Sequence, residues 1–434
     1  MSVKSDKIKE TLKATKLRRQ TQVCRVYEAK VDKSKLSDAT KTQLNKLFLQ
    51  AKWFYNAVLS SESLFDFDTK SKSVQVKVDT IFEERELDTL SSQVKQSLID
   101  RMSSATRTLK TLKTKGKKVG KLKFKSYINS IPLKQFDNTY KFIDNHHVRI
   151  QNIKEPLYVH GLDQVKNSDI ANANLIRNGD DYYLKITTYK EKPIDTLKEY
   201  SSVGIDFNIE AGCQLVLDNG IAFGFNVETH NDEQLKNYQR KLARINRTNK
   251  KLKKNKHSKN RLKTILKIQR CHRKHKNKKN EIRNQIVSVL KKNFNKICHQ
   301  KESINGWQRM WGKRIQGTAL AGIIARLDTS STTNVIGKFI PTTKTCNVCG
   351  YKNKDLTLDI KWWTCPECNT RHNRHINAAI NMLPRSERAS TSVESSSSAK
   401  SLLALESKFK AIGVIVRLLS ETDNSGTYPG SPRL

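Results

Sequence analysis

Long apolar runs are missing from this chain. Residues 1–22 are rich in lysine and contain no apolar stretch, so no signal peptide is predicted. The apolar run at residues 411–416 is far too short to cross a bilayer. We therefore expect no membrane partner.

Acidic residues are scarce relative to basic ones. The chain has 82 Lys and Arg but only 41 Asp and Glu, a formal net charge of +41. Such an excess repels itself unless a polyanion neutralises it, which favours a nucleic-acid partner over a basic membrane-surface or ribosome-associated protein. At 434 residues with 36% hydrophobic content, about two to four compact domains are expected.

The eight cysteines do not form the evenly spaced framework of a disulfide-rich secreted protein. Four are isolated, while two Cys-x2-Cys pairs are separated by fifteen residues: Cys346, Cys349, Cys365 and Cys368. Two such pairs supply four thiolates for tetrahedral Zn²⁺, and a complete four-cysteine set is typical of a structural site. The pattern predicts a reducing cytoplasmic location, and zinc does not need the nearby His372 or His375.

Alternating and helical patterns divide the first half of the chain. Residues 23–31 alternate as in a strand, and apolar residues recur at helical spacing over 44–58 and 98–112. From 131 to 190 the period is two, with a hairpin turn predicted at Asn178-Gly179. These segments predict a small β-barrel with a helical insertion.

A long basic stretch follows two further strands predicted within residues 201–225. Between Lys236 and Arg283 there are 21 Lys or Arg and one acid, Glu281. Few i,i+4 ion pairs can form there, so phosphates are the expected counter-charges. The residues predicted to bind nucleic acid are Lys241, Arg244, Arg247, Lys250, Lys254, Arg261, Arg270 and Lys274.

Four segments, in this order, carry a family resemblance. They are "VGIDFNI" with Asp206, "CHQKESINGWQRMWGKRIQ" with Glu302, the four-cysteine ribbon, and "HNRHINAAIN" with His375. Together they resemble the TnpB (OrfB) proteins of bacterial insertion sequences, which are RNA-guided nucleases related to the type V CRISPR effectors. The resemblance covers roughly residues 23 to 383.

The resemblance implies a multidomain α+β fold. A wedge β-barrel with an inserted helical recognition lobe would precede an RNase H-like (RuvC) nuclease domain, which the zinc ribbon interrupts. The implied segments are an N-terminal basic segment with the first part of the barrel (1–38), the helical lobe (39–125), the rest of the barrel (126–195), the RuvC-like domain with basic helices (196–340), the ribbon (341–370), the last RuvC-like segment (371–384) and a disordered, Ser-rich tail (385–434).

The resemblance also implies the site. Asp206 and Glu302 match the first two catalytic acids, which would hold Mg²⁺ or Mn²⁺ in a two-metal mechanism. His375 stands where the family has its third acid, and Asn373 stands where a further Asp is common. Imidazole is a poorer ligand for Mg²⁺ than a carboxylate, so His375 is either a working variant ligand or a decayed acid.

Two functions stay open from the sequence. The first is a transposon-encoded endonuclease that uses a guide RNA from the transposon end to cut double-stranded DNA beside a short motif. The second is a nuclease-impaired guided DNA-binding protein, such as a repressor or a decayed copy. A third, a basic zinc-ribbon protein of ribosome or transcription type, does not explain the ordered Asp206 and Glu302 motifs. Either of the first two would be cytoplasmic and nucleoid-associated.

Overall fold

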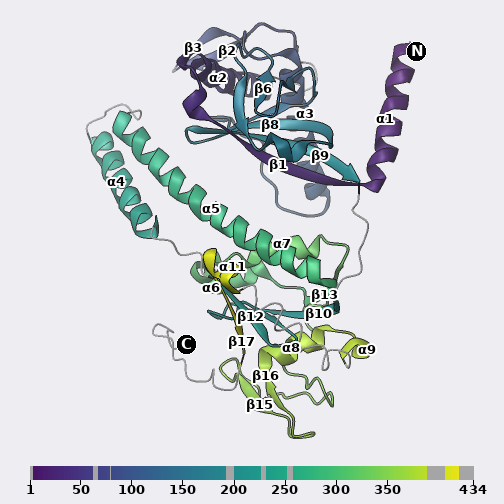
Figure 1. Ribbon diagram of the computed structural model, residues 1–434. Coiled ribbons are helices and arrows are strands. Elements are labelled where there is room, and N and C mark those ends of the chain that lie inside the picture. Colours follow the sequence, from purple (N-terminus) through teal and green to yellow (C-terminus); the bar gives the residue numbers. More distant parts are fainter. Residues whose placement is uncertain are drawn as a thin grey trace. The chain divides into compact units, whose positions relative to one another are not determined.

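The computed structural model describes residues 3–61, 67–78, 80–191, 200–225, 231–251, 258–388 and 406–419 (Figure 1). The chain divides into two compact units, Met1–Ile194 and Asp195–Leu434. Among the described helices, none combines the length and the apolar character that a membrane span requires.

The first unit is built on a strongly curved, nearly closed antiparallel sheet of seven strands in the order β4-β8-β9-β1-β7-β6-β5 (Figure 1). The long strand β1 pairs with β9 along residues 22–30 and with β7 at residues 30–31. The strands are β1 (Gln22–Val31), β4 (Ser130–Leu133), β5 (Tyr140–Phe142), β6 (His147–Ile150), β7 (Leu157–His160), β8 (Asp169–Asn178) and β9 (Asp181–Glu191). The predicted strands at 23–31 and within 131–190 are confirmed.

Two helices are inserted between β1 and β4, as the periodicity predicts. They are α2 (Asp38–Ser60) and α3 (Ser92–Thr114), each begun by a serine N-cap, Ser37 or Ser91. Other elements of this unit are α1 (Val3–Thr21), η1 (Lys33–Lys35), η2 (Leu162–Val165) and the hairpin β2 (Ser73–Val78) with β3 (Ile81–Glu86).

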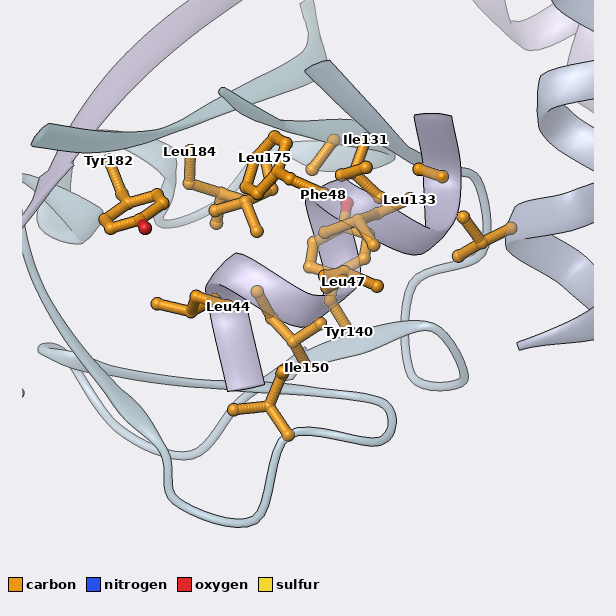
Figure 2. Packing of buried hydrophobic residues seen from close by; sticks show 14 of the residues in the cluster. Leu44, Leu47, Phe48, Ile131, Leu133, Tyr140, Ile150, Leu175, Tyr182 and Leu184 are labelled. Atoms are coloured by element: carbon orange, nitrogen blue, oxygen red, sulfur yellow. The ribbon is translucent and has the colours of Figure 1, made fainter. Parts of the chain in front are cut away.

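The apolar stripe of α2 is core. Leu44, Leu47 and Phe48 lie against strand residues such as Ile131 and Leu175, all buried (Figure 2). Full burial of such side chains stabilises the unit by about 1.5–3 kcal/mol each. The stripe therefore holds the insertion on the sheet and is not a base-stacking surface.

The predicted hairpin turn lies one residue later than expected. Asn178 pairs with Asp181, so the loop is Gly179-Asp180, and Gly179 has a φ of 68°. A left-handed φ at the first loop position favours glycine, whereas Asn178 completes the ladder.

The second unit contains a six-stranded sheet in the order β14-β13-β10-β11-β12-β17. Strands β10, β11 and β12 pair antiparallel, while β13 and β14 run parallel to β10. The strands are β10 (Tyr200–Phe207), β11 (Leu215–Leu217), β12 (Ile221–Phe225), β13 (Phe294–Gln300), β14 (Thr333–Ile336) and β17 (Val414–Leu418).

Helices and a small ribbon complete this unit. The carboxyl-terminal half of α5 buries Ile282, Ile286 and Leu290 in the same core as the sheet, while its first half pairs with α4. The elements are α4 (Asn231–Lys251), α5 (Lys259–Asn293), α6 (Ile304–Gln316), α7 (Leu320–Asp328), β15 (Trp362–Thr364), β16 (Arg371–Asn373), α8 (Arg374–Met382), α9 (Arg385–Arg388) and α11 (Glu406–Ala411).

The expectation of a disordered tail from residue 385 is wrong for residues 385–388 and 406–419. Strand β17 pairs with β12 along its whole length, and α11 places Phe409 against Phe223, with ring centroids 5.6 Å apart. Alternating Val414 and Val416 are buried, so this segment covers a sheet edge that would otherwise be open. The Ser-rich residues 389–405 lie outside the described residues.

We predict that Gly204→Ala on β10 destabilises the second unit by about 3 kcal/mol, because an added Cβ would lie 1.9 Å from the backbone oxygen of Ala379 in α8. Relieving this overlap would require the backbone of β10 or of α8 to move, which costs free energy. Thermal or denaturant unfolding measures the effect. Gly312→Ala is the control, since its Cβ would meet nothing within 4 Å. Equal stability of the two variants would contradict the close packing.

Candidate metal centre and nuclease site

The four predicted zinc ligands converge. The Sγ atoms of Cys346, Cys349, Cys365 and Cys368 all lie within 4.8 Å of one another, and two pairs are 3.6 and 3.5 Å apart. These separations are too long for disulfides and close to the roughly 3.8 Å that tetrahedral Zn–S bonds of about 2.3 Å require. The set therefore fits structural zinc.

His372 contacts this cluster without belonging to it. Its Nε2 lies 3.1 Å from Sγ of Cys346, and its ring packs against Trp363 with centroids 4.9 Å apart. Burial lowers the pKa of His372, so the neutral ring is favoured. A neutral N–H beside the sulfur can hydrogen-bond a thiolate and orient it.

Asn373 is the N-cap residue of α8. Its side-chain oxygen accepts hydrogen bonds from the backbone N–H groups of His375 and Ile376, at 3.0 and 3.3 Å. Asparagine and aspartate are about equally good N-caps. Asn373 therefore caps this helix about as well as an aspartate at the same position would.

Two asparagines of α8 bind the base of the ribbon. Asn377 and Asn381, one helical turn apart, both donate to the carbonyl oxygen of Thr345, at 2.8 and 2.6 Å. Asn377 also accepts from the backbone N–H of Asn347 at 3.0 Å. The Asn-Ala-Ala-Ile-Asn motif thus couples the metal cluster to α8.

Helix α8 also lies directly against β10. Ala378 and Ala379 are fully buried, and the lack of a side chain at Gly204 permits the approach. This packing brings His375 from α8 to Asp206 near the end of β10.

His375 lies between two carboxylates. Its Nδ1 is 2.8 Å from Oδ2 of Asp206, and its Nε2 is 3.4 Å from Oε2 of Glu210. The side chains of His375 and Asp206 are each only 13% exposed, so solvent screens their interaction weakly. Lys361 reaches the other oxygen of Glu210 at 2.5 Å.

The charged groups in this cluster shift one another's pKa values. Burial by itself would lower the pKa of His375, but the hydrogen bonds and charges of Asp206 and Glu210 outweigh it and raise that pKa to about 9. The same contact with His375, together with Lys361, lowers the pKa of Glu210 to about 2. In this arrangement the imidazolium form of His375 and the ammonium group of Lys361 together offset the charge of the two carboxylates.

Glu302 lies just beyond β13, at the edge of the sheet where β10 also ends. Residue Ile205 of β10 is in register with His299 of the parallel strand β13. Burial raises the pKa of Glu302 to about 7, and the negative charge of Asp206 adds to the rise. A buried carboxyl group whose ionisation a neighbouring carboxylate disfavours is a favourable place for a cation.

The three predicted catalytic residues nevertheless do not form a preassembled ligand set. In the part of the chain that the structure describes, the four cysteines are the one group of three or more His, Cys, Asp or Glu whose ligand atoms converge. The structure brings His375 to Asp206, and it places Glu302 at the same sheet edge without direct contact among all three.

Sequence reasoning missed Glu210 and Lys361. Glu210 is an acid four residues after Asp206, a signal that was available in the chain. Lys361 lies 151 residues from Glu210, and nothing in the local pattern points to their contact.

The predicted nucleic-acid residues lie on two adjacent helices. Lys241, Arg244, Arg247 and Lys250 are exposed on α4. Arg270 and Lys274 are exposed on α5, and Arg261 joins the helices by donating to Asn246 at 2.9 Å. Lys254 lies outside the described residues, and the binding role of the set stays a prediction.

Comparisons of the sequence point to one family. The family model described as "Cas12f1-like, TNB domain" matches residues 331–382. A curated protein of Streptomyces pristinaespiralis named "Putative RNA-guided DNA endonuclease" is 41% identical over 49 residues, which are 11% of this chain. The chain spans only 12% of that relative's length. These matches confirm the predicted resemblance to the TnpB and Cas12f-like family.

Two solved structures resemble parts of this chain at low sequence identity. A cryo-EM structure of a Cas12f1–sgRNA–target DNA complex is 14% identical, with a TM-score of 0.46, and the match covers 83% of this chain and 99% of that one. A CRISPR-Cas12f ternary complex is 15% identical, with a TM-score of 0.25 and coverage of 80% and 85%. These scores are too low to establish a common fold.

We predict that the ribbon carries stoichiometric zinc and that Cys346→Ser or Cys365→Ser loses it together with the ribbon's fold, because metal binding and folding are coupled in such modules. Elemental analysis and limited proteolysis of the purified protein measure both effects. Cys24→Ser, at an exposed cysteine outside the cluster, should keep its zinc. A wild-type protein without zinc would contradict the assignment.

Proposed function

We propose that this relative of the TnpB and Cas12f-like family is a transposon-encoded RNA-guided DNA endonuclease. It would cut DNA at a RuvC-type active site, and His375 would lower the rate of cleavage there. The single observation that carries the proposal is the meeting of Asp206 and His375, from β10 and α8, beside the sheet edge that holds Glu302.

The sheet supports the nuclease assignment. Three antiparallel strands followed by two parallel ones, in the order β12-β11-β10-β13-β14, are the arrangement expected of an RNase H-like domain. The first acid lies on the central strand β10 and the second follows its parallel neighbour, so both reach the same edge. The ribbon between β14 and α8 matches the order of segments that the resemblance implies.

The donor set fits a hard cation only in part. The carboxylates of Asp206 and Glu302 suit Mg²⁺ or Mn²⁺ and would hold it. A bound divalent cation would supply water activation and stabilise the leaving oxygen of the phosphodiester. His375 does not fit, because its hydrogen bond occupies Oδ2 of Asp206 and its proton competes with a metal for the same carboxylate.

A second candidate is a guided DNA-binding protein that does not cut. The observation that favours it is the same 2.8 Å contact between His375 and Asp206, strengthened by Glu210 on the other side of the ring. Such a protein would still use base pairing and backbone contacts to hold its target, since neither needs a catalytic metal.

The proposed partners follow from charge and family. A guide RNA from the transposon end and a double-stranded DNA target with a short adjacent motif would neutralise part of the +41 charge. The expected location is the cytoplasm, in association with the nucleoid.

His375→Asp should raise the cleavage rate in Mg²⁺ about tenfold or more, equivalent to about 1.4 kcal/mol in the barrier, because it exchanges a competing cation for a carboxylate ligand. Wild type should cut slowly in Mg²⁺ and faster in Mn²⁺. Cleavage of a guide-matched duplex by the guide-loaded protein measures both rates.

Asp206→Ala is the matched control. It should abolish cutting and leave guided binding intact. If wild type cuts in Mg²⁺ as fast as His375→Asp, His375 is a working ligand and the slowing role is wrong. If His375→Asp also fails to cut while guided binding persists, the non-cutting candidate replaces the endonuclease.

RNA transcribed next to the gene should co-purify with the protein, and binding should weaken steeply with salt as counterions are released. Arg244→Gln with Arg247→Gln on α4 should lower the slope of log affinity against log salt by about one to two. The same charge loss at Lys110 and Lys113 of α3 is the control. A protein that binds no RNA at physiological salt would contradict the proposal.

A further inference from the structure

The first unit contains a groove of its own, and none of its lining residues belongs to the proposed nuclease site of the second unit. The groove has a volume of about 400 Å³, which is within the usual range of small-molecule sites. Its walls are formed by α2, by α3 and by the segment that leads from α3 to β4. The lining residues are Tyr55, Leu98, Arg101, Phe124, Lys125, Ser126, Tyr127, Ile128, Asn129 and Ser130.

The segment that leads from α3 to β4 is held in place by hydrogen bonds. Asn56 of α2 donates to the carbonyl oxygen of Lys125 and accepts from its backbone N–H, both at 2.9 Å. Arg101 of α3 donates to the carbonyl oxygen of Ser130 at 3.3 Å and to Asn174 at 2.8 Å. The groove is therefore preformed.

Two aromatic rings line this groove and remain largely exposed. Phe124 is 66% exposed and Tyr127 is 72% exposed, although the adjacent Ile128 is buried. Large aromatic side chains are costly to leave in water, and a base can stack on either ring.

The groove is also cationic. Arg101 and Lys125 line it, and none of its lining residues is acidic. Lys125 lies 4.2 Å from the ring centroid of Tyr55. Desolvation lowers the pKa of Lys125, and the charge of Arg101 lowers it further, so the attraction of a bound anion for the charged lysine would offset both effects.

We propose that this groove binds one unpaired nucleotide of a single-stranded nucleic acid, with the base on Phe124 and Tyr127 and the phosphate at Lys125 and Arg101. The assignment rests on the proposed function for its ligand class. The base of a nucleotide could stack on the aromatic surface, and its phosphate could bind the two cations.

The test uses the full-length, guide-loaded protein and short single-stranded oligonucleotides that carry one 5-iodouracil, made as DNA and as RNA. Irradiation should cross-link the probe to the peptide that contains Phe124 and Tyr127. At about 0.3 M salt, where electrostatic binding elsewhere is weakened, Phe124→Ala with Tyr127→Ala should lower affinity about fivefold or more.

Three matched variants separate the contributions. Phe124→Tyr with Tyr127→Phe should keep the affinity because both rings remain. Lys125→Gln should lower it and reduce its salt dependence. Phe82→Ala removes a similarly exposed ring, 65% exposed on β3, and should change nothing.

If the double alanine variant loses affinity for only the DNA probe or only the RNA probe, the result supports the site and identifies which kind of strand occupies it. Unchanged affinity in the double alanine variant, with no cross-link in this peptide, overturns the site while the proposed function stands if the guide RNA remains bound. A protein that binds no nucleic acid at all overturns both.

Discussion

The close approach of α8 to β10 is the constraint on which the rest of the second unit depends. Gly204 leaves no side chain between the two elements, and the small Ala378 and Ala379 fill the contact. Since β10 carries Asp206 and α8 carries His375, this packing sets their separation. The ribbon joins the same helix through Asn377 and Asn381. One packing contact therefore positions both the metal cluster and the candidate nuclease site.

The chemistry of the site follows from which charge neutralises its acids. Burial and the nearby charge of Asp206 make ionised Glu302 unfavourable without a cation. A third carboxylate at position 375 would increase the demand for metal. His375 instead supplies a positive charge of its own, and Glu210 with Lys361 holds that ring in place. In the proposed function, this charge stabilises the site in the absence of metal and lowers its affinity for metal, and we propose that as the physical basis for slow hydrolysis.

The features that could be predicted from the sequence alone depend on local residue patterns or on motifs that follow one another in a fixed order along the chain. Cysteine spacing was enough to place a four-thiolate cluster, and apolar periodicity identified α2, α3 and the curved sheet. Asp206 and His375 were found as members of an ordered set of motifs, but their direct contact joins residues 169 apart and depends on the shape fit at Gly204. Strand β17 was missed because a Ser-rich stretch precedes it and its partner β12 lies almost two hundred residues earlier in the chain. Contacts of this kind depend on tertiary packing rather than on local pattern.

The central claim is that His375 competes with a divalent cation for Asp206. The most direct measurement is the affinity of the guide-loaded protein for Mn²⁺ by electron paramagnetic resonance, with Asp206→Ala used to identify the signal from this site. The account predicts that His375→Asp binds Mn²⁺ about tenfold more tightly than wild type, and that His375→Ala binds at least as tightly as wild type. Weaker Mn²⁺ binding in His375→Ala would contradict the account, because His375 would then be a ligand.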